Sequence, residues 1–270
     1  MIKKLYSYNN NRDIWRIIPA GDENLLIEER NKKTKEVFFN CINISSGKKS
    51  LNGFQLNDKY WVGVEAVHND IIFFHRFIKP DLPTHKNIIA FDIKKKSVLW
   101  ENKDLTFLNI SNDFLLAYKS LFEGREYYKL DIETGNIIEV SKDIPINKNS
   151  DEYQNNSLKD FTFSSIYNNE IDLTPSVKGV LQKIKENNVI VGKIEFIDQK
   201  STLLIGFHSP TKNGKLNKIL NAVDIVSGKF ILNKIINSNI EAFVPDSFFL
   251  IKNFLFVIWE TKKLVCFNII

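Results

Sequence analysis

A short signature recurs along this chain: Asp or Asn, then Ile, a variable residue, Ser or Thr, and Gly. Full copies begin at Asn43, Asp131 and Asp224, and shortened copies begin at Asp92 and Asn268. Each copy follows a short apolar segment, and most copies precede another such segment. A signature that returns at a regular spacing predicts one small unit of structure, stacked several times.

The spacing of the copies indicates what the repeated unit is. Neighbouring copies are roughly 40–50 residues apart, with one interval about twice as long, and a four-stranded propeller blade has this period. The segments between them are rich in β-branched and aromatic residues and are separated by Asn, Asp, Gly and Lys, which is typical of strands and turns. We therefore predict an all-β protein, a five-bladed β-propeller in which residues 1–270 form a single domain.

One stretch, 141–190, departs from the repeat and is interpreted as an insertion. It begins with residues rich in Asn, Ser, Asp and Lys, followed by a strand-like run at 161–165. A helix is expected at 175–187, because Thr174 can cap it, Pro175 suits its first turn, and apolar residues follow at helical spacing. If this stretch formed a degenerate blade, the propeller would have six blades.

The last repeat is one strand short. Its expected strands are 242–244, 254–259 and 264–267, whereas a strand-like segment at 3–7 has no partner nearby in the sequence. We predict that 3–7 supplies the missing outer strand of the last blade, because this pairing would close the ring and remove exposed sheet edges.

Composition and charge narrow the possible partners. The net charge of +5 comes from 37 basic and 32 acidic residues interleaved along the chain, which argues against a nucleic-acid partner. The N-terminus lacks the apolar region of a secretory signal, and no apolar stretch approaches the ~18–20 residues of a spanning helix. The sequence thus predicts a soluble, cytoplasmic protein with no membrane partner. Cys41 and Cys266 hold equivalent places before two signatures, so we expect buried thiols without a disulfide.

Several segments resemble known propellers. The hairpin formed by 89–93, with the sequence Ile-Ala-Phe-Asp-Ile, and 98–100 resembles blades of quinoprotein-like and WD-repeat-like propellers. The whole chain resembles a propeller-like domain family of unknown function from Bacteroidota-type bacteria. The segments that carry this second resemblance are 14–16, 25–30, 194–196 and 246–249. The resemblance implies a bacterial propeller but no reaction. The cofactor-binding residues and vicinal cysteines of quinoprotein enzymes are not found in the sequence, so no cofactor is expected.

Polar residues end the second strand of each repeat. Equivalent positions of a closed ring share one face, so these ends are expected on a single rim beside the loops 77–87 and 209–217. Strand ends can be polar merely because they meet water. The alternative is a recognition surface, and its residues would be Glu28, Arg30, His75, Arg76, Lys119, His208 and Glu260.

The four histidines give a weak metal signal. His68 and His75 bracket one predicted strand and should lie roughly 20 Å apart, so they cannot share a metal ion. His85 follows His75 in the chain and could approach it. Without a neighbouring cysteine or paired carboxylate, the sequence assigns no metal site.

Two functions are left open by the sequence. It contains no Gly-rich phosphate loop, no Gly-x-Ser-x-Gly and no His-Glu-x-x-His, which favours a binding or interaction scaffold for an unknown protein or small molecule. The alternative is a carbohydrate-active hydrolase, which needs two carboxylates about 5–9.5 Å apart in the central funnel. The carboxylates expected on inner strands are Glu65, Glu195, Glu241 and Asp246. A propeller supports many functions, so the fold cannot choose between these two.

Overall fold

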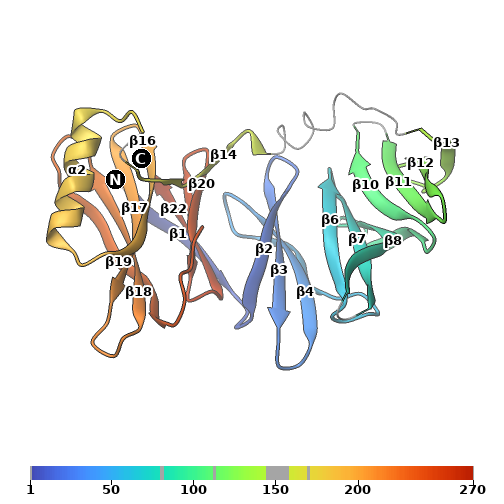
Figure 1. The fold of residues 1–270 in the computed structure, drawn as a ribbon, viewed down its shortest axis with the longest axis horizontal. Helices are drawn as coiled ribbons and strands as arrows, with labels where there is room; N and C mark the ends of the chain where they lie inside the picture. The colour runs from blue at the N-terminus through green and yellow to red at the C-terminus, as the bar shows by residue number, and fades with distance from the viewer. Residues whose placement is uncertain (1, 80–81, 112–113, 144–157, 169–170, 270) are drawn as a thin grey trace. The chain divides into compact units, whose positions relative to one another are not determined.

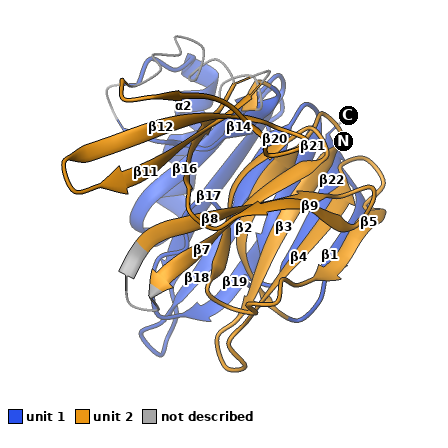
Figure 2. Ribbon diagram, turned by 90° about the vertical axis from the view of Figure 1, so that its right-hand side faces the viewer, with its two compact units in different colours: residues 1–11, 160–270 blue, residues 12–159 orange. Residues whose placement is uncertain are grey.

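The protein is all-β apart from one helix among the residues that the structure describes. The computed structural model describes residues 2–79, 82–111, 114–143, 158–168 and 171–269. These residues form five antiparallel sheets (Figure 1). The chain divides into two compact units, coloured separately in Figure 2: unit 1 is Met1–Asn11 with Asp160–Ile270, and unit 2 is Arg12–Lys159.

Unit 2 contains three four-stranded sheets whose strands pair in chain order. The first sheet consists of β2 (Asp13–Ala20), β3 (Asn24–Asn31), β4 (Glu36–Asn43) and β5 (Lys49–Phe54). The second consists of β6 (Val62–His68), β7 (Ile71–Lys79), β8 (Leu82–Asp92) and β9 (Ser97–Asn102). The third consists of β10 (Thr106–Ile110), β11 (Phe114–Leu121), β12 (Gly124–Asp131) and β13 (Ile137–Ser141). Three consecutive hairpin sheets are what the repeat predicts for this part of the chain.

Unit 1 contains two five-stranded sheets. One has the order β15 (Ser165–Ile166), β16 (Val191–Gln199), β17 (Thr202–Pro210), β18 (Leu216–Asp224) and β19 (Phe230–Ile240). The other has the order β1 (Ile2–Asn9), β22 (Lys263–Ile269), β21 (Phe254–Trp259), β20 (Phe248–Ile251) and β14 (Phe161–Phe163). The predicted pairing of the N-terminal segment with the last sheet is therefore confirmed, since β1 lies antiparallel to β22.

Two sequence predictions in unit 1 are corrected. The strand expected at 161–165 is split, because β14 pairs with β20 while β15 pairs with β16 in the other sheet. The strand expected at 242–244 is not formed, and β20 takes its place. All four side chains of β20 are buried, whereas Ala242 and Phe243 are exposed. Pro245 also cannot donate a hydrogen bond to a sheet ladder.

The predicted helix is confirmed as α2 (Pro175–Asn187). The hydroxyl of Thr174 accepts a hydrogen bond from the amide of Val177 at 3.4 Å, which caps the first turn. Val177, Leu181 and Ile184 form its buried face and pack in one core cluster with residues of β16 and β17. The helix is thus an amphipathic cover on one sheet of unit 1 (Figure 1). No helix in the described part of the chain is long and apolar enough to cross a membrane.

Each full copy of the recurring signature forms a tight turn between the last two strands of its sheet. The side-chain oxygen of its first residue accepts the amide of the third residue onward, at 2.8 Å for Asp131 and Thr134 and at 2.7 Å for Asp224 and Ser227. The hydroxyls of Thr134 and Ser227 donate to the same carboxylate oxygens, each at 2.7 Å. The hydroxyl and amide bonds together favour the ionised carboxyls and lower the pKa of both aspartates. The signature glycine adopts a positive φ, +71° at Gly135, a conformation that other residues adopt only with strain.

The backbone amide of the signature isoleucine forms a hydrogen bond to the turn between two earlier strands of the same sheet. The amide of Ile44 donates to the carbonyl of Glu23 at 2.7 Å, and the amide of Ile225 donates to that of Ser201 at 2.8 Å. Ile44 is also buried. Each full copy of the signature therefore encodes one hydrogen-bonded turn within a sheet. This is why the spacing of the signature predicts the succession of sheets. Cys41 and the second cysteine, in β22, are both buried and free, as predicted.

Candidate functional site

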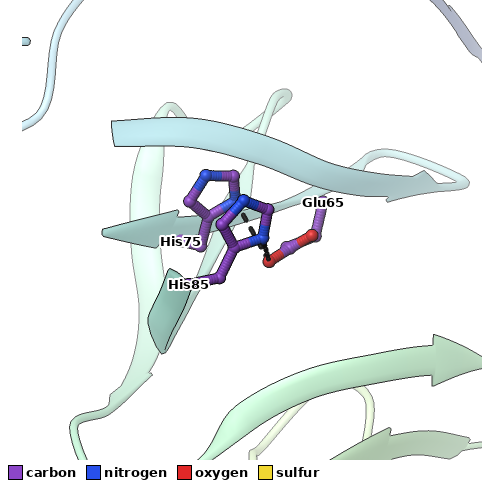
Figure 3. A group of neighbouring side chains, drawn as sticks. All are labelled: Glu65, His75 and His85. Carbon is purple, nitrogen blue, oxygen red and sulfur yellow. Dashed lines mark hydrogen bonds and ion pairs between the residues drawn. The ribbon is translucent and has the colours of Figure 1, made fainter. Parts of the chain in front are cut away.

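Three potential metal ligands meet on the second sheet of unit 2. Glu65 lies on β6, His75 on β7 and His85 on β8, and Figure 3 shows the carboxylate beside the two imidazole rings. Oε1 of Glu65 is 2.7 Å from Nδ1 of His85 and 3.1 Å from Nδ1 of His75. The two rings stack with their centroids 3.6 Å apart and their planes 8° from parallel. One ligand atom from each residue lies within 4.8 Å of the other two.

The sheet places these side chains through two local irregularities. The pairing of β6 with β7 shifts between Val64 and Ala66, which leaves Glu65 as the unpaired residue of a bulge. Gly63 is paired with His75, and a Cβ at Gly63 would lie 2.8 Å from two atoms of that ring. The ring therefore occupies the space that a side chain would need. The bulge and the glycine together allow a carboxylate and a large ring to share one face of the sheet.

Burial sets the electrostatics of this cluster. The side chain of His75 is 2% exposed, that of Glu65 13%, and that of His85 38%. Neither ring nitrogen of His75 has a partner in hydrogen-bonding geometry among the described residues. Burial of the Glu65 carboxyl acts to raise its pKa, but the two imidazoles outweigh this effect, and the net pKa lies below its ordinary value. Glu65 is thus held as an anion next to a buried imidazole.

An aromatic side chain supports the two rings from one side. Phe77 meets His75 edge to face, with centroids 4.9 Å apart, and meets His85 in the same way at 5.4 Å. Trp61 contacts Phe77 in turn at 6.4 Å. The rings are therefore positioned by packing, and rigid placement of ligands on neighbouring strands favours a preformed site.

A second polar cluster is buried in unit 1. Nζ of Lys218 lies 2.8 Å from Oε1 of Glu195, and the two side chains are 0% and 9% exposed. His208 pairs with Lys218 across β17 and β18, and its Nε2 accepts the amide of Val244 at 3.1 Å. Burial and the charge of Lys218 lower the pKa of His208 to about 4. Burial also lowers the pKa of Lys218, and Glu195 offsets only part of this effect.

A third polar cluster links two sheets of unit 2. Glu28 is fully buried and forms an ion pair with Arg30 at 2.7 Å and with Arg16 at 3.7 Å. The guanidinium of Arg30 also donates to the carbonyl of Val62 at 2.9 Å, and that of Arg16 donates to the carbonyl of Val64 at the same distance. These bonds connect the first sheet to β6. The cluster therefore has a structural role, and its arginines are engaged.

The predicted rim residues fall into separate groups within the two units. Glu28 and Arg30 contact each other in the first sheet. Arg76 pairs with Glu101 at 3.3 Å. Of the other predicted rim residues, His75 and His208 are buried. Lys119 is exposed on β11. Glu260 is exposed after β21, and its carboxylate accepts a hydrogen bond from the hydroxyl of Ser238 at 2.8 Å. A common recognition surface made of these residues stays a prediction.

The four candidate carboxylates differ in their surroundings. Glu65 belongs to the histidine cluster and Glu195 to the buried lysine pair. Glu241 is exposed and lies 3.2 Å from Lys215. Asp246 is exposed and has a φ of 51°. The sequence predicted that His85 could approach His75, but Glu65 was considered separately, as a funnel carboxylate. One sequence signal could have connected the carboxylate to the histidines. Gly63 and Glu65 are two residues apart and so lie on one face of their strand, and Gly63 leaves room there for a side chain from the neighbouring strand, β7.

Comparison with known proteins gives distant similarities. Residues 18–100, which contain the histidine cluster, match a family described as a domain of unknown function (DUF4905). No curated protein matches the chain.

Among solved structures, an uncharacterized protein from Listeria monocytogenes EGD-e is similar, with 10% identity, 94% of each chain covered and a TM-score of 0.36. The AfRom2 CNH domain has 9% identity, covers 100% of this chain and 99% of its own, and has a TM-score of 0.34. The Dos1 propeller has 12% identity over 91% of this chain and 50% of its own, with a TM-score of 0.27. Similarities this distant say nothing about function, so a functional proposal has to be argued from the residues of this chain.

Proposed function

We propose that this protein is a five-bladed β-propeller that acts as a non-catalytic binding scaffold. Two features support the ring: apart from β14, the strands β2 to β22 fill the sheets in chain order, and the N-terminal strand β1 pairs with the last strand, β22. Bacterial origin and a cytoplasmic location, both expected from the sequence, belong to the same proposal. A closed ring of 270 residues should have a radius of gyration of about 18 Å. Small-angle scattering that gives a clearly larger value would argue against the ring.

The binding site that we propose is the cluster of Glu65, His75 and His85. The observation that carries this proposal is the buried imidazole of His75. Its Nδ1 lies 3.1 Å from Oε1 of Glu65 outside hydrogen-bonding geometry, its Nε2 has no hydrogen-bond partner among the residues that the structure describes, and His85 beside it is more exposed. A buried polar atom without a partner costs about 1–3 kcal/mol, so such groups are rare unless they meet water or a ligand. The cluster is accessible to solvent at His85, and the imidazole of His75 lacks full hydrogen bonding. Both properties suit a site that receives a ligand.

A ligand screen tests this proposal. The melting temperature of the protein would be measured with sugars, nucleotides, inorganic anions and divalent metals, because a ligand of the folded state raises it. The same screen on His85→Gln removes one imidazole from the open side of the cluster. A ligand that stabilises the wild-type protein but not the variant supports the site. If every stabilising ligand acts equally on both proteins, the site is misassigned.

The alternative is a carbohydrate-active hydrolase using funnel carboxylates. Three of the four candidates are engaged: Glu65 with two imidazoles, Glu195 with Lys218 and Glu241 with Lys215. A retaining or inverting glycosidase needs a pair of carboxyl groups that face the substrate. Turnover of aryl glycosides that is lost in Glu65→Gln or Glu195→Gln, while the fold is kept, would favour the hydrolase over the scaffold.

A further inference from the structure

We infer that Glu65, His75 and His85 form a binding site for a divalent transition metal ion of the zinc class, with one coordination position left for an outside ligand. This inference rests on the proposed binding function and names the ligand of its site. Two imidazoles and one carboxylate from three adjacent strands supply the ligand set. Zinc sites with three protein ligands commonly use this combination and keep a fourth position open.

The distances fit a shared ion. Zinc bonds to imidazole nitrogen and carboxylate oxygen are about 2.1 Å long, so donor atoms around a tetrahedral ion lie roughly 3.4 Å apart. Oε1 of Glu65 is already 2.7 Å from Nδ1 of His85 and 3.1 Å from Nδ1 of His75. To bind one ion, the two imidazoles would have to rotate out of their stacked arrangement, because the lone pair of each nitrogen lies in the plane of its ring. No strand has to move, because all three ligands lie on one hydrogen-bonded sheet.

The donor types select the class of metal. Imidazole nitrogen suits zinc, copper, nickel and iron, whereas magnesium and calcium prefer sites made of oxygen atoms. The site offers two nitrogens and one carboxylate, so it should discriminate against both alkaline-earth ions. Burial adds to this preference, because magnesium gives up its water ligands reluctantly and the site is partly enclosed by Phe77 and the buried ring of His75.

The contacts within the cluster do not satisfy it as an ordinary ion pair. The Nδ1 atoms of both imidazoles approach the same oxygen of Glu65, and Nδ1 of His75 does so outside hydrogen-bonding geometry. An ion between the three groups would use both nitrogen lone pairs and the carboxylate charge together. The partial exposure of His85 gives the ion an entry side and leaves room for a water or another ligand.

Metal titration of the full-length protein, with any affinity tag removed, tests the inference. Zn²⁺ binding would be followed by calorimetry, and Co²⁺ binding by the visible absorption of a low-coordinate nitrogen and oxygen site. We expect one ion per chain. We also expect Zn²⁺ to raise the melting temperature by roughly 5–10 °C at a hundredfold excess over its dissociation constant. Mg²⁺ should have no such effect.

Variants assign the binding to these residues. His85→Gln and Glu65→Gln should each weaken Zn²⁺ binding at least about tenfold, since each removes one of three ligands. His68→Gln changes a histidine of the same sheet outside the cluster and serves as the matched control, which should bind as the wild type does. Circular dichroism shows whether each variant is folded. His75 is not chosen first, because truncating its buried ring also opens a cavity.

The outcomes separate the metal from the binding function. Absence of saturable Zn²⁺ and Co²⁺ binding, or equal binding by His85→Gln and the wild type, overturns the metal site. If another ligand in the screen still depends on His85, the proposed binding function stands without the metal. If no ligand depends on His85, both conclusions fail.

Discussion

The buried pair of Lys218 and Glu195 gives the sharpest test of the energetics in unit 1. At 2.8 Å the attraction is about 6 kcal/mol with an effective dielectric constant near 20, but burial costs several kcal/mol for each charge. The lowered pKa of Lys218 indicates that burial outweighs the attraction at this amine. We therefore expect a pair that adds little net stability when intact and destabilises strongly when broken.

Single substitutions should expose this imbalance. Lys218→Met leaves the buried carboxylate of Glu195 without its cation, and Glu195→Leu leaves the buried amine of Lys218 without its anion. Each change should lower the free energy of unfolding by about 3–5 kcal/mol at pH 7. The double variant Lys218→Met with Glu195→Leu removes both charges and should be close to wild type. The cycle thus predicts a coupling energy of several kcal/mol.

Urea unfolding at pH 7 measures all four proteins, with the slope of the transition checked for constancy. The exposed pair of Lys215 and Glu241, 3.2 Å apart, provides the matched control. Its coupling should not exceed about 1 kcal/mol, because solvent screens it. If Lys218→Met changes the unfolding free energy by less than about 1 kcal/mol, or if both cycles give the same coupling, the reasoning from burial is wrong.

Three further predictions concern other parts of the chain. The pKa of His208 is about 4 in the folded state and near 6.5 in the unfolded state, so the unfolded chain binds the proton more readily between these values. The free energy of unfolding should therefore fall as the pH drops from about 6.5 to about 4, and His208→Gln should flatten this pH dependence in urea unfolding. Tyr8→Ala removes a buried ring of β1 and should destabilise by about 3 kcal/mol in urea; no loss would mean that this strand adds nothing to the last sheet. Gly63→Ala places a methyl group against the ring of His75. It should cost about 1–3 kcal/mol in urea unfolding and weaken Zn²⁺ binding in calorimetry; an unchanged affinity would contradict the proposed geometry.

The signature turns, the helix and the pairing of the N-terminal strand could be predicted from the sequence. The signature turns form because an Asp or Asn side chain bonds to amides two or three residues later and a glycine accepts a positive φ, as at Asp131 and Gly135. The helix was predicted with its bounds because Thr174 and Pro175 mark its start. The pairing of β1 with β22 followed from counting strands, since the last repeat was one strand short. The turns and the helix depend on neighbours within a few residues, whereas the pairing of β1 with β22 depends on the strand count of the repeat.

The site arises from contacts that no short segment specifies. Glu65, His75 and His85 meet only because β6, β7 and β8 pair in one register, and a bulge at Glu65 changes that register locally. Lys218 and Glu195 likewise meet across β17, over the space left by Gly206. A shift of one residue in a strand turns every side chain to the opposite face. Sequence patterns therefore identified the strands and turns, while the side chains that share a site were fixed by the packing of the folded sheets.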